Sequence, residues 1–107
     1  MDLNRFDLVI VDLDPTVGSE IRKTRPCIVV TPDELNRKLR TVAIIPLTSQ
    51  HKSYPYRVPI KTRFGISQAV PEQIRTVDKS RISKNVGSIT PREAAALTDV
   101  IRRMYVD

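Results

Sequence analysis

The stretch FDLVIVDLDPTVGSEIRKTRPCIVV (residues 6–30) contains two short apolar runs separated by a polar loop. The first run, FDLVIVDL (6–13), is rich in β-branched residues, which favour strands, and an Asp-Pro pair closes it. The second run, PCIVV (26–30), follows directly on Arg25. These features predict two strands joined by a charged loop that contains glycine.

Further short strands are predicted beyond this stretch. TVAIIPLT (41–48) indicates a third strand, and YRVPI (56–60) indicates an edge strand because Pro59 cannot donate a backbone hydrogen bond. SQAVPEQIRTV (67–77) and VGSI (86–89) add extended segments. Strands this short and closely spaced predict a mainly β, α+β fold, built as a compact antiparallel sheet or small barrel.

A helix is predicted at the C-terminal end. In TPRE (90–93), Thr90 is the expected N-cap, Pro91 occupies the first helical position, and Glu93 completes a capping box. The helix should pack on the sheet through an apolar stripe at helical spacing. The stripe consists of Leu97, Val100, Ile101 and Met104.

A second helix is predicted to begin at TPDE (31–34), which repeats this chemistry with Thr31, Pro32 and Glu34. Little apolar periodicity follows before Arg40. This helix should therefore be short.

The composition is that of one soluble domain. The 107 residues are expected to form a single domain, 1–107, and their 40% hydrophobic and 28% charged content is ordinary for a globular protein. No apolar run approaches the roughly 20 residues of a membrane-spanning helix. The N-terminus lacks the basic region and cleavage site of a signal peptide. A cytoplasmic protein without a membrane partner is expected.

The net charge of +6 is unevenly distributed along the chain. Residues 1–20 hold five acidic residues and one basic residue, whereas residues 21–63 hold ten basic and two acidic residues. This asymmetry indicates a basic surface that faces an anionic partner, with nucleic acid as the leading candidate. A solvated surface that only promotes solubility is the alternative.

The residue types argue against a metal or cofactor. One cysteine, Cys27, excludes an internal disulfide, and with His51 as the single histidine a zinc site of the usual type is not expected. Cys27 lies in an apolar run, which favours a buried strand residue over a nucleophile. Asp12 and Asp14 follow a strand, where solvent-facing turn carboxylates are common.

Polar residues gather at the predicted strand ends. Arg25 precedes the second strand, Thr48 and Ser49 end the third, and Gln73 and Arg75 lie in a later segment. Strand ends from different parts of an antiparallel sheet meet at one rim. An arginine fork suits a phosphate, and a threonine hydroxyl can donate or accept a hydrogen bond. The set therefore indicates a phosphate site.

Purely structural roles for these side chains are the alternative. Arg25 would then form a salt bridge to Glu20 or Asp14. Thr48 would cap its strand. From the residues alone, both interpretations stay open.

Three segments carry a resemblance to a known family. VDLDPTVGSEIRKTRPCIVV (11–30), IIPLTSQ (44–50) and EQIRTVDKSRI (72–82) resemble, in order and spacing, the signature blocks of the MazF/PemK toxins. The likeness runs from about Phe6 to the C-terminal helix. One block alone is weak evidence, because a TRP triplet is trivial, but three blocks in order are specific.

The resemblance implies the toxin half of a bacterial toxin–antitoxin pair. Such a toxin is a sequence-selective, metal-independent endoribonuclease that cuts single-stranded RNA, chiefly mRNA. The 2′-OH of the substrate attacks the phosphate, which leaves 2′,3′-cyclic phosphate and 5′-OH ends. The implied fold is a strongly bent SH3-like barrel with attached helices, assembled as a homodimer. A cognate antitoxin would block the RNA groove.

The resemblance also assigns site residues. Arg25 and Thr48 match the catalytic pair, with Arg25 stabilising the phosphorane and Thr48 holding a phosphate oxygen. Glu20 is a candidate general base. By resemblance, Ser19, Glu20, Gln73 and Arg75 would contact RNA. The predicted binding set also includes Arg22 and Lys23, for general attraction of phosphates, and Ser49 at the same rim.

One position departs from the family pattern. Family members often carry glutamine after the glutamate of the GSE block, whereas this chain has Ile21. The cleavage sequence is therefore not predicted. Two other functions remain as alternatives, a non-catalytic RNA-binding barrel and a gyrase-inhibiting toxin of the same fold.

Overall fold

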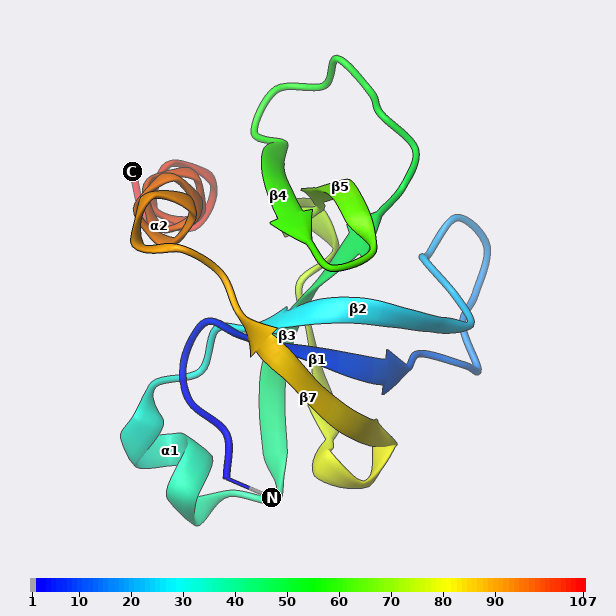
Figure 1. The fold of residues 1–107 in the computed structure, drawn as a ribbon, viewed down its shortest axis with the longest axis vertical. Helices are drawn as coiled ribbons and strands as arrows, with labels where there is room; N and C mark the ends of the chain where they lie inside the picture. The colour runs from blue at the N-terminus through cyan, green and yellow to red at the C-terminus, as the bar shows by residue number, and fades with distance from the viewer. Residues whose placement is uncertain (1) are drawn as a thin grey trace.

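The computed structural model describes residues 2–107, which form a curled antiparallel sheet with helices attached (Figure 1). The mainly β fold with a C-terminal helix that the sequence predicts is confirmed. The elements in chain order are β1 (Asp7–Asp12), β2 (Thr24–Val29), α1 (Asp33–Lys38), β3 (Thr41–Thr48), β4 (Val58–Thr62), β5 (Gly65–Ala69), the 3-10 helix η1 (Pro71–Gln73), β6 (Arg75–Asp78), the 3-10 helix η2 (Lys79–Arg81), β7 (Ile82–Ser88) and α2 (Pro91–Tyr105).

Strand β3 organises the sheet. The strand order is β4-β5-β3-β2-β1-β7, β6 also pairs with β3, and every pairing is antiparallel. One edge of β3 pairs with β6 over residues 41–44 and with β5 at residues 47–48, while its other edge pairs with β2. Because one edge serves two strands in succession, the sheet curls into a half-barrel. Strand β4 lies at the edge, as Pro59 predicts.

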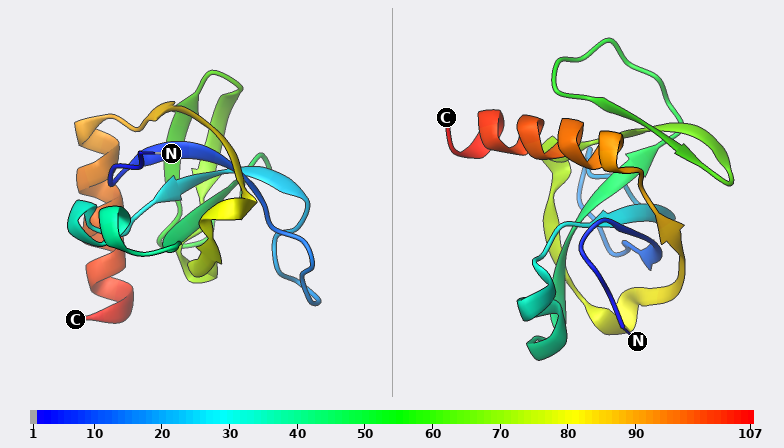
Figure 2. Two further views of the ribbon diagram at one scale, coloured as in Figure 1. Left: turned by 90° about the horizontal axis from the view of Figure 1, so that it is seen from below. Right: turned by 60° about the vertical axis from the view of Figure 1, so that its left-hand side comes forward.

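Side chains of the central strands alternate between two apolar clusters, as the twofold period of a strand requires. The first cluster includes Val9, Val11, Cys27, Val29, Val42 and Ile44. The second includes Leu8, Ile28, Ile45, Leu47, Ile60 and Leu97. Helix α2 covers the second cluster, and Figure 2 shows the β1–β2 loop (residues 13–23) projecting on the side away from this helix.

The start of α2 has the predicted capping box. The Glu93 N–H donates to Thr90 Oγ1 at 3.1 Å, and the Thr90 N–H donates to Glu93 Oε1 at 2.9 Å. The second carboxylate oxygen of Glu93 accepts the Lys61 N–H at 2.8 Å, so the same residue ties the helix to β4. At the other end, the Tyr105 hydroxyl donates to the Pro71 carbonyl at 2.8 Å. Both ends of α2 are therefore anchored to the sheet.

The predicted cap at Thr31 is wrong. Helix α1 is short, as predicted, but its N-cap is Pro32 and no side chain caps it. The Thr31 hydroxyl instead accepts the Ala43 N–H of β3 at 2.6 Å. A hydroxyl that already serves the neighbouring strand is not available to the first turn of the helix.

Several strand boundaries also differ from the prediction: β4 begins and ends two residues later than 56–60, and β7 begins four residues before 86–89. Strand β2 begins at Thr24, so Arg25 lies inside the strand and does not precede it. The expected extended segment 67–77 is interrupted by η1, because the chain turns at Pro71 between β5 and β6. This turn brings residues 71–75 beside the β1–β2 loop, where they contribute to the site described next.

Candidate functional site

Arg25 and Thr48 lie on neighbouring strands at one end of the sheet. Strands β2 and β3 are antiparallel, and Cys27 pairs with Pro46 at the last bonded position. Extending this register by two residues sets Arg25 opposite Thr48. The other edge of β2 pairs Arg25 with Val11 of β1. The backbone register thus places residues 25 and 48 on neighbouring strands at one rim of the sheet, while their side chains line two separate cavities.

Arg25 is half-buried and takes no part in an ion pair within residues 2–107. Its Nε donates to the Arg22 carbonyl at 3.3 Å, which orients the side chain. The Glu20 carboxylate accepts the Val17 N–H of its own loop at 2.6 Å. The salt bridge to Glu20 or Asp14 that the sequence left open is therefore not formed, and the guanidinium keeps its charge available for an anionic ligand.

The Thr48 hydroxyl accepts the Gln50 N–H at 3.2 Å. In this respect Thr48 does cap its strand, as the structural alternative predicted. A hydroxyl that accepts one hydrogen bond still carries its own proton. Thr48 can therefore donate that proton to an anionic oxygen while Gln50 holds its orientation.

Two cavities open beside these side chains. The Arg25 cavity, of about 270 Å³, is lined by Arg25, Ser49 and Phe64 among others. The Thr48 cavity, of about 150 Å³, is lined by Ser19, Ile21, Thr48, Gln50, Lys52, Tyr54, Arg57, Val70 and Gln73. Consecutive residues Thr48 and Ser49 face different cavities, as expected from the alternation of a strand.

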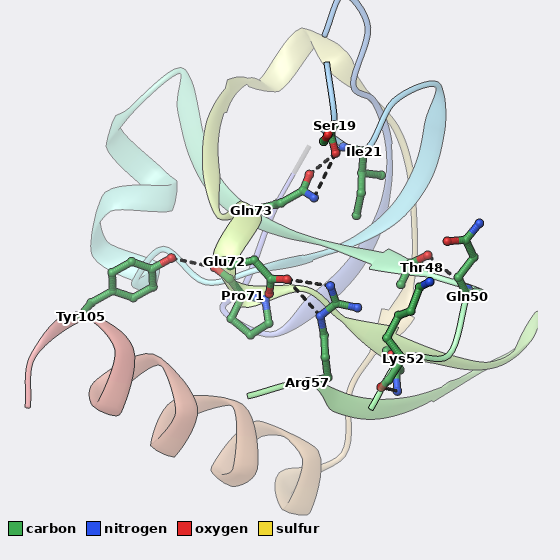
Figure 3. Close-up of polar contacts among 11 residues, drawn as sticks. Ser19, Ile21, Thr48, Gln50, Lys52, Arg57, Pro71, Glu72, Gln73 and Tyr105 are labelled. Atoms are coloured by element: carbon green, nitrogen blue, oxygen red, sulfur yellow. Dashed lines mark hydrogen bonds and ion pairs between the residues drawn. The ribbon is translucent and has the colours of Figure 1, made fainter. Parts of the chain in front are cut away.

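The side chain of Gln73 holds the backbone of the β1–β2 loop (Figure 3). Its Oε1 accepts the Ile21 N–H at 2.6 Å, and its Nε2 donates to the Ser19 carbonyl at 3.5 Å. Both hydrogen bonds use main-chain atoms, so they do not depend on the side chain at position 21. The carboxamide that the sequence assigned to RNA is thus engaged with the protein's own loop.

Two arginines hold the beginning of the same loop. Arg75 Nη1 donates to the Leu13 carbonyl at 3.1 Å, and Arg81 Nη1 donates to the carbonyls of Asp12 and Asp14. Arg75, which the sequence placed among the RNA contacts, therefore has a loop-supporting contact. Arg81 was missed, although it lies in the third signature block.

Cys27 packs beneath this region and is fully buried. Its burial raises the pKa of the thiol to about 12, and the nearby Arg75 charge offsets part of this effect. A thiol that stays protonated is a poor nucleophile. The prediction of a buried strand cysteine is confirmed.

The remaining predicted binding residues are exposed. Ser49 directly follows β3 and lines the Arg25 cavity. The predicted binding residues on the β1–β2 loop, all exposed, are Ser19, Glu20, Arg22 and Lys23. They give one side of the site three ionic groups and a hydroxyl.

The sequence analysis missed a group of residues on the other side of the site. Arg57 bonds to Glu72 through Nε at 3.1 Å and Nη2 at 2.6 Å, and its side chain is only 9% exposed. Its guanidinium carbon lies 4.9 Å from the centre of the Tyr54 ring. The available signal was YPYR (54–57), which places two aromatic residues between strands in a chain with only 5% aromatics.

Within residues 2–107, no three or more histidine, cysteine, aspartate or glutamate side chains group as metal ligands would. Asp12 and Asp14 are exposed at the start of the loop. None of the helices in this part of the chain has the length and apolarity to cross a membrane.

The fold and the site define a small protein with a curled β-sheet, in which a cationic and a hydroxyl side chain lie on neighbouring strands at one end. The model of the PemK-like, MazF-like toxins of type II toxin–antitoxin systems matches residues 4–105. The chain therefore belongs to the PemK/MazF toxin family.

Curated relatives share this assignment. The endoribonuclease toxin MazF of Escherichia coli (strain K12) is 33% identical over 88 residues, which cover 81% of this chain and 79% of the relative. The endoribonuclease MazF9 of Mycobacterium tuberculosis is 31% identical over 110 residues, covering 94% of this chain and 93% of the relative.

Solved structures have the same fold. The crystal structure of MazF from Deinococcus radiodurans matches with a TM-score of 0.86 at 23% identity, covering 97% of this chain and 96% of that one. A chain of the MazE–MazF crystal structure from the same organism matches with a TM-score of 0.80 at 18% identity, covering 99% and 97%.

Proposed function

We propose that this chain is a sequence-selective endoribonuclease that cleaves single-stranded mRNA as the toxin of a type II toxin–antitoxin pair. The observation that supports the proposal is the β2–β3 register, which sets residue 25 opposite residue 48 when it is extended by two positions, together with an Arg25 guanidinium outside every ion pair of the described residues. The curated relatives named as endoribonucleases support it.

The reaction uses a nucleophile that the substrate supplies. The 2′-oxygen attacks the adjacent phosphorus and loses its proton to a base, while the bond from phosphorus to the 5′-oxygen breaks. The 5′-oxygen takes up a proton. The products are a 2′,3′-cyclic phosphate and a 5′-OH end, and no metal or cofactor is required.

Arg25 stabilises the dianionic phosphorane. Its Nε is held by the Arg22 carbonyl, so the terminal nitrogens present a fixed charge to the Arg25 cavity. Pre-organised charge of this kind acts where negative charge develops in the transition state. Thr48, oriented by the Gln50 N–H, donates its proton to a phosphate oxygen.

Glu20 is the candidate base. Its carboxylate is exposed and accepts the Val17 N–H within the loop, which leaves a second oxygen for the 2′-OH. General-base action requires this oxygen to come within hydrogen-bond reach of the 2′-OH in the RNA complex. Replacing Glu20 by glutamine keeps the loop bond and removes the basic group.

The proposal includes the partners and the location. The chain acts as one domain, 1–107, assembles as a homodimer and works in the cytoplasm, where mRNA is found. A cognate antitoxin inhibits it, in keeping with the MazE–MazF complexes among the structural neighbours. Exposed Arg22 and Lys23 contribute general attraction for phosphates.

The test uses a short RNA with a cleavage site mapped by primer extension on a long transcript. A single 2′-deoxy substitution on the 5′ side of the scissile phosphate should abolish cleavage, because the nucleophile is missing. EDTA should leave the rate unchanged. Cleavage of the deoxy-substituted oligonucleotide would overturn the mechanism. Salt-sensitive binding without products would favour the non-catalytic barrel, and inhibition of supercoiling would favour the gyrase alternative.

A further inference from the structure

The Thr48 cavity has the scale of one small planar group. Its volume of about 150 Å³ lies below the roughly 300–1,000 Å³ of pockets for drug-sized ligands. Thr48 forms part of its wall, so any group inside it lies next to the phosphate on which Thr48 acts. The lining also includes Tyr54 and Arg57 from the β3–β4 loop (residues 49–57).

Tyr54 is an exposed ring with a rigid support. The residue is 56% exposed, although the Arg57 guanidinium lies 4.9 Å from the ring centre. Arg57 is in turn fixed by two hydrogen bonds to Glu72, and its side chain is nearly buried. A cation thus supports the ring while much of the aromatic surface remains open. Flat, fixed and exposed aromatic surfaces are what nucleobases stack on.

The loop that carries Tyr54 is also held by hydrogen bonds at two other points. The Gln68 carboxamide accepts the Lys52 N–H at 3.0 Å and donates to the Lys52 carbonyl at 3.1 Å. The Gln50 N–H bonds to Thr48 at 3.2 Å. A loop that is ordered before binding loses little entropy when a ligand arrives. The exposed Lys52 adds positive charge for the backbone of the bound strand.

We propose that the Thr48 cavity binds one nucleobase of the RNA, adjacent to the scissile phosphate, and that this base stacks on Tyr54. The proposal rests on the endoribonuclease function proposed above and deepens it, because it assigns one position of the cleavage sequence to this cavity. Arg57 and Glu72 are positioning residues that hold the ring. Gln50, which is exposed and lines the same cavity, can hydrogen-bond the edge of the base.

The experiment compares Tyr54→Ala, Tyr54→Phe and a matched control, Tyr56→Ala. Tyr56 lies on the same loop and is 44% exposed, but it does not line the cavity. Each variant cleaves a short RNA under single-turnover conditions. The same RNA is also prepared with each nucleotide next to the scissile phosphate replaced, one at a time, by an abasic residue.

Tyr54→Ala should lower kcat/KM roughly 5- to 150-fold, the effect of removing one base-stacking ring. Tyr54→Phe keeps the ring and should restore cleavage, and Tyr56→Ala should stay within about twofold of the parent. One abasic position should slow the parent by a factor similar to that of Tyr54→Ala. The same abasic RNA should not slow Tyr54→Ala further, because the ring and the base form one interaction.

Results that contradict the base site can be told apart from results that contradict the proposed function. If the parent cleaves RNA and Tyr54→Ala cleaves it equally well, the base site is wrong and the proposed function stands. The base site is also wrong if every abasic position slows Tyr54→Ala by the same factor as it slows the parent, because the ring and the base would then act independently. If Tyr54→Ala keeps full cleavage but escapes inhibition by co-expressed antitoxin, the cavity is a protein-binding site. A parent that cleaves no RNA overturns both proposals.

Discussion

The carboxamide of Gln73 and the backbone of Ile21 are joined across 52 positions of the chain by a hydrogen bond of 2.6 Å. The same carboxamide also donates to the Ser19 carbonyl at 3.5 Å. Glutamine is often found in the family at the position of Ile21, but this tether uses the main chain and tolerates the change. The Gln73 tether thus holds the main chain of the loop, while the Ile21 side chain packs against the first apolar cluster.

Gln73→Ala should therefore loosen the loop. A hydrogen bond of this kind contributes about 0.5–1.5 kcal/mol, so exchange of the Ile21 amide hydrogen should accelerate about 2- to 10-fold. RNA cleavage should fall by a similar factor because Ser19 and Glu20 are displaced. Amide exchange measured by NMR and a single-turnover digest provide the two readouts. Reduced cleavage with unchanged Ile21 exchange would show that Gln73 contacts RNA directly.

Arg25 is expected to be the most sensitive position in the site. Arg25→Ala removes the pre-organised charge and should reduce kcat about 10²- to 10³-fold, as the loss of one transition-state donor does. Arg25→Lys keeps the charge but lacks the planar fork, so it should recover only part of the rate. The rate at which each variant cleaves a short RNA measures both effects. Parental rates in both variants would exclude a catalytic role for Arg25.

Much of the fold was predictable because its signals are local. The third predicted strand, 41–48, matches β3 without a shift, since a continuous apolar run bounded by polar residues marks both ends. The capping box at Thr90 was predictable for the same reason. Thr31 shows the limit of local signals. Its hydroxyl bonds to Ala43, which only the tertiary pairing of the segment with β3 brings within reach.

The site was predictable only where strand register determines it. The motifs mark Arg25 and Thr48, and the antiparallel register of β2 and β3, extended by two residues, sets these positions opposite each other. The tethers of Gln73 and Arg75 to loop carbonyls were not predictable, because any loop can present a carbonyl. The Arg57–Glu72 pair joins residues 15 positions apart through the turn of η1, which the predicted continuous segment did not contain.

The capping box predicts a stability effect without an effect on catalysis. Thr90→Ala removes the hydroxyl that accepts the Glu93 N–H and should lower the free energy of unfolding by about 0.5–2 kcal/mol. Thr98→Ala is the matched control, because Thr98 is exposed within α2 and alanine is the better helix former there. Urea unfolding measures both variants. Equal stabilities for the two would contradict an energetic role for the cap.

The buried thiol of Cys27 predicts a dependence of stability on alkaline pH. Burial raises its pKa from 9.0 to about 12 in the folded chain, with Arg75 opposing part of the shift. Between these values the unfolded chain loses the thiol proton and the folded chain retains it. The unfolded state therefore binds fewer protons, so the free energy of unfolding decreases as the pH rises.

The contribution of Cys27 should be constant below pH 9.0 and should fall between pH 9.0 and about 12, at no more than about 1.4 kcal/mol per pH unit. Lysine and tyrosine side chains also titrate in this range, so the parent is compared with Cys27→Ala by urea unfolding at successive pH values. The difference between their free energies of unfolding at each pH gives the contribution of the Cys27 thiol. The parent should lose stability more steeply than the variant, and parallel curves would mean that the thiol ionises as readily in the folded chain as in the unfolded one.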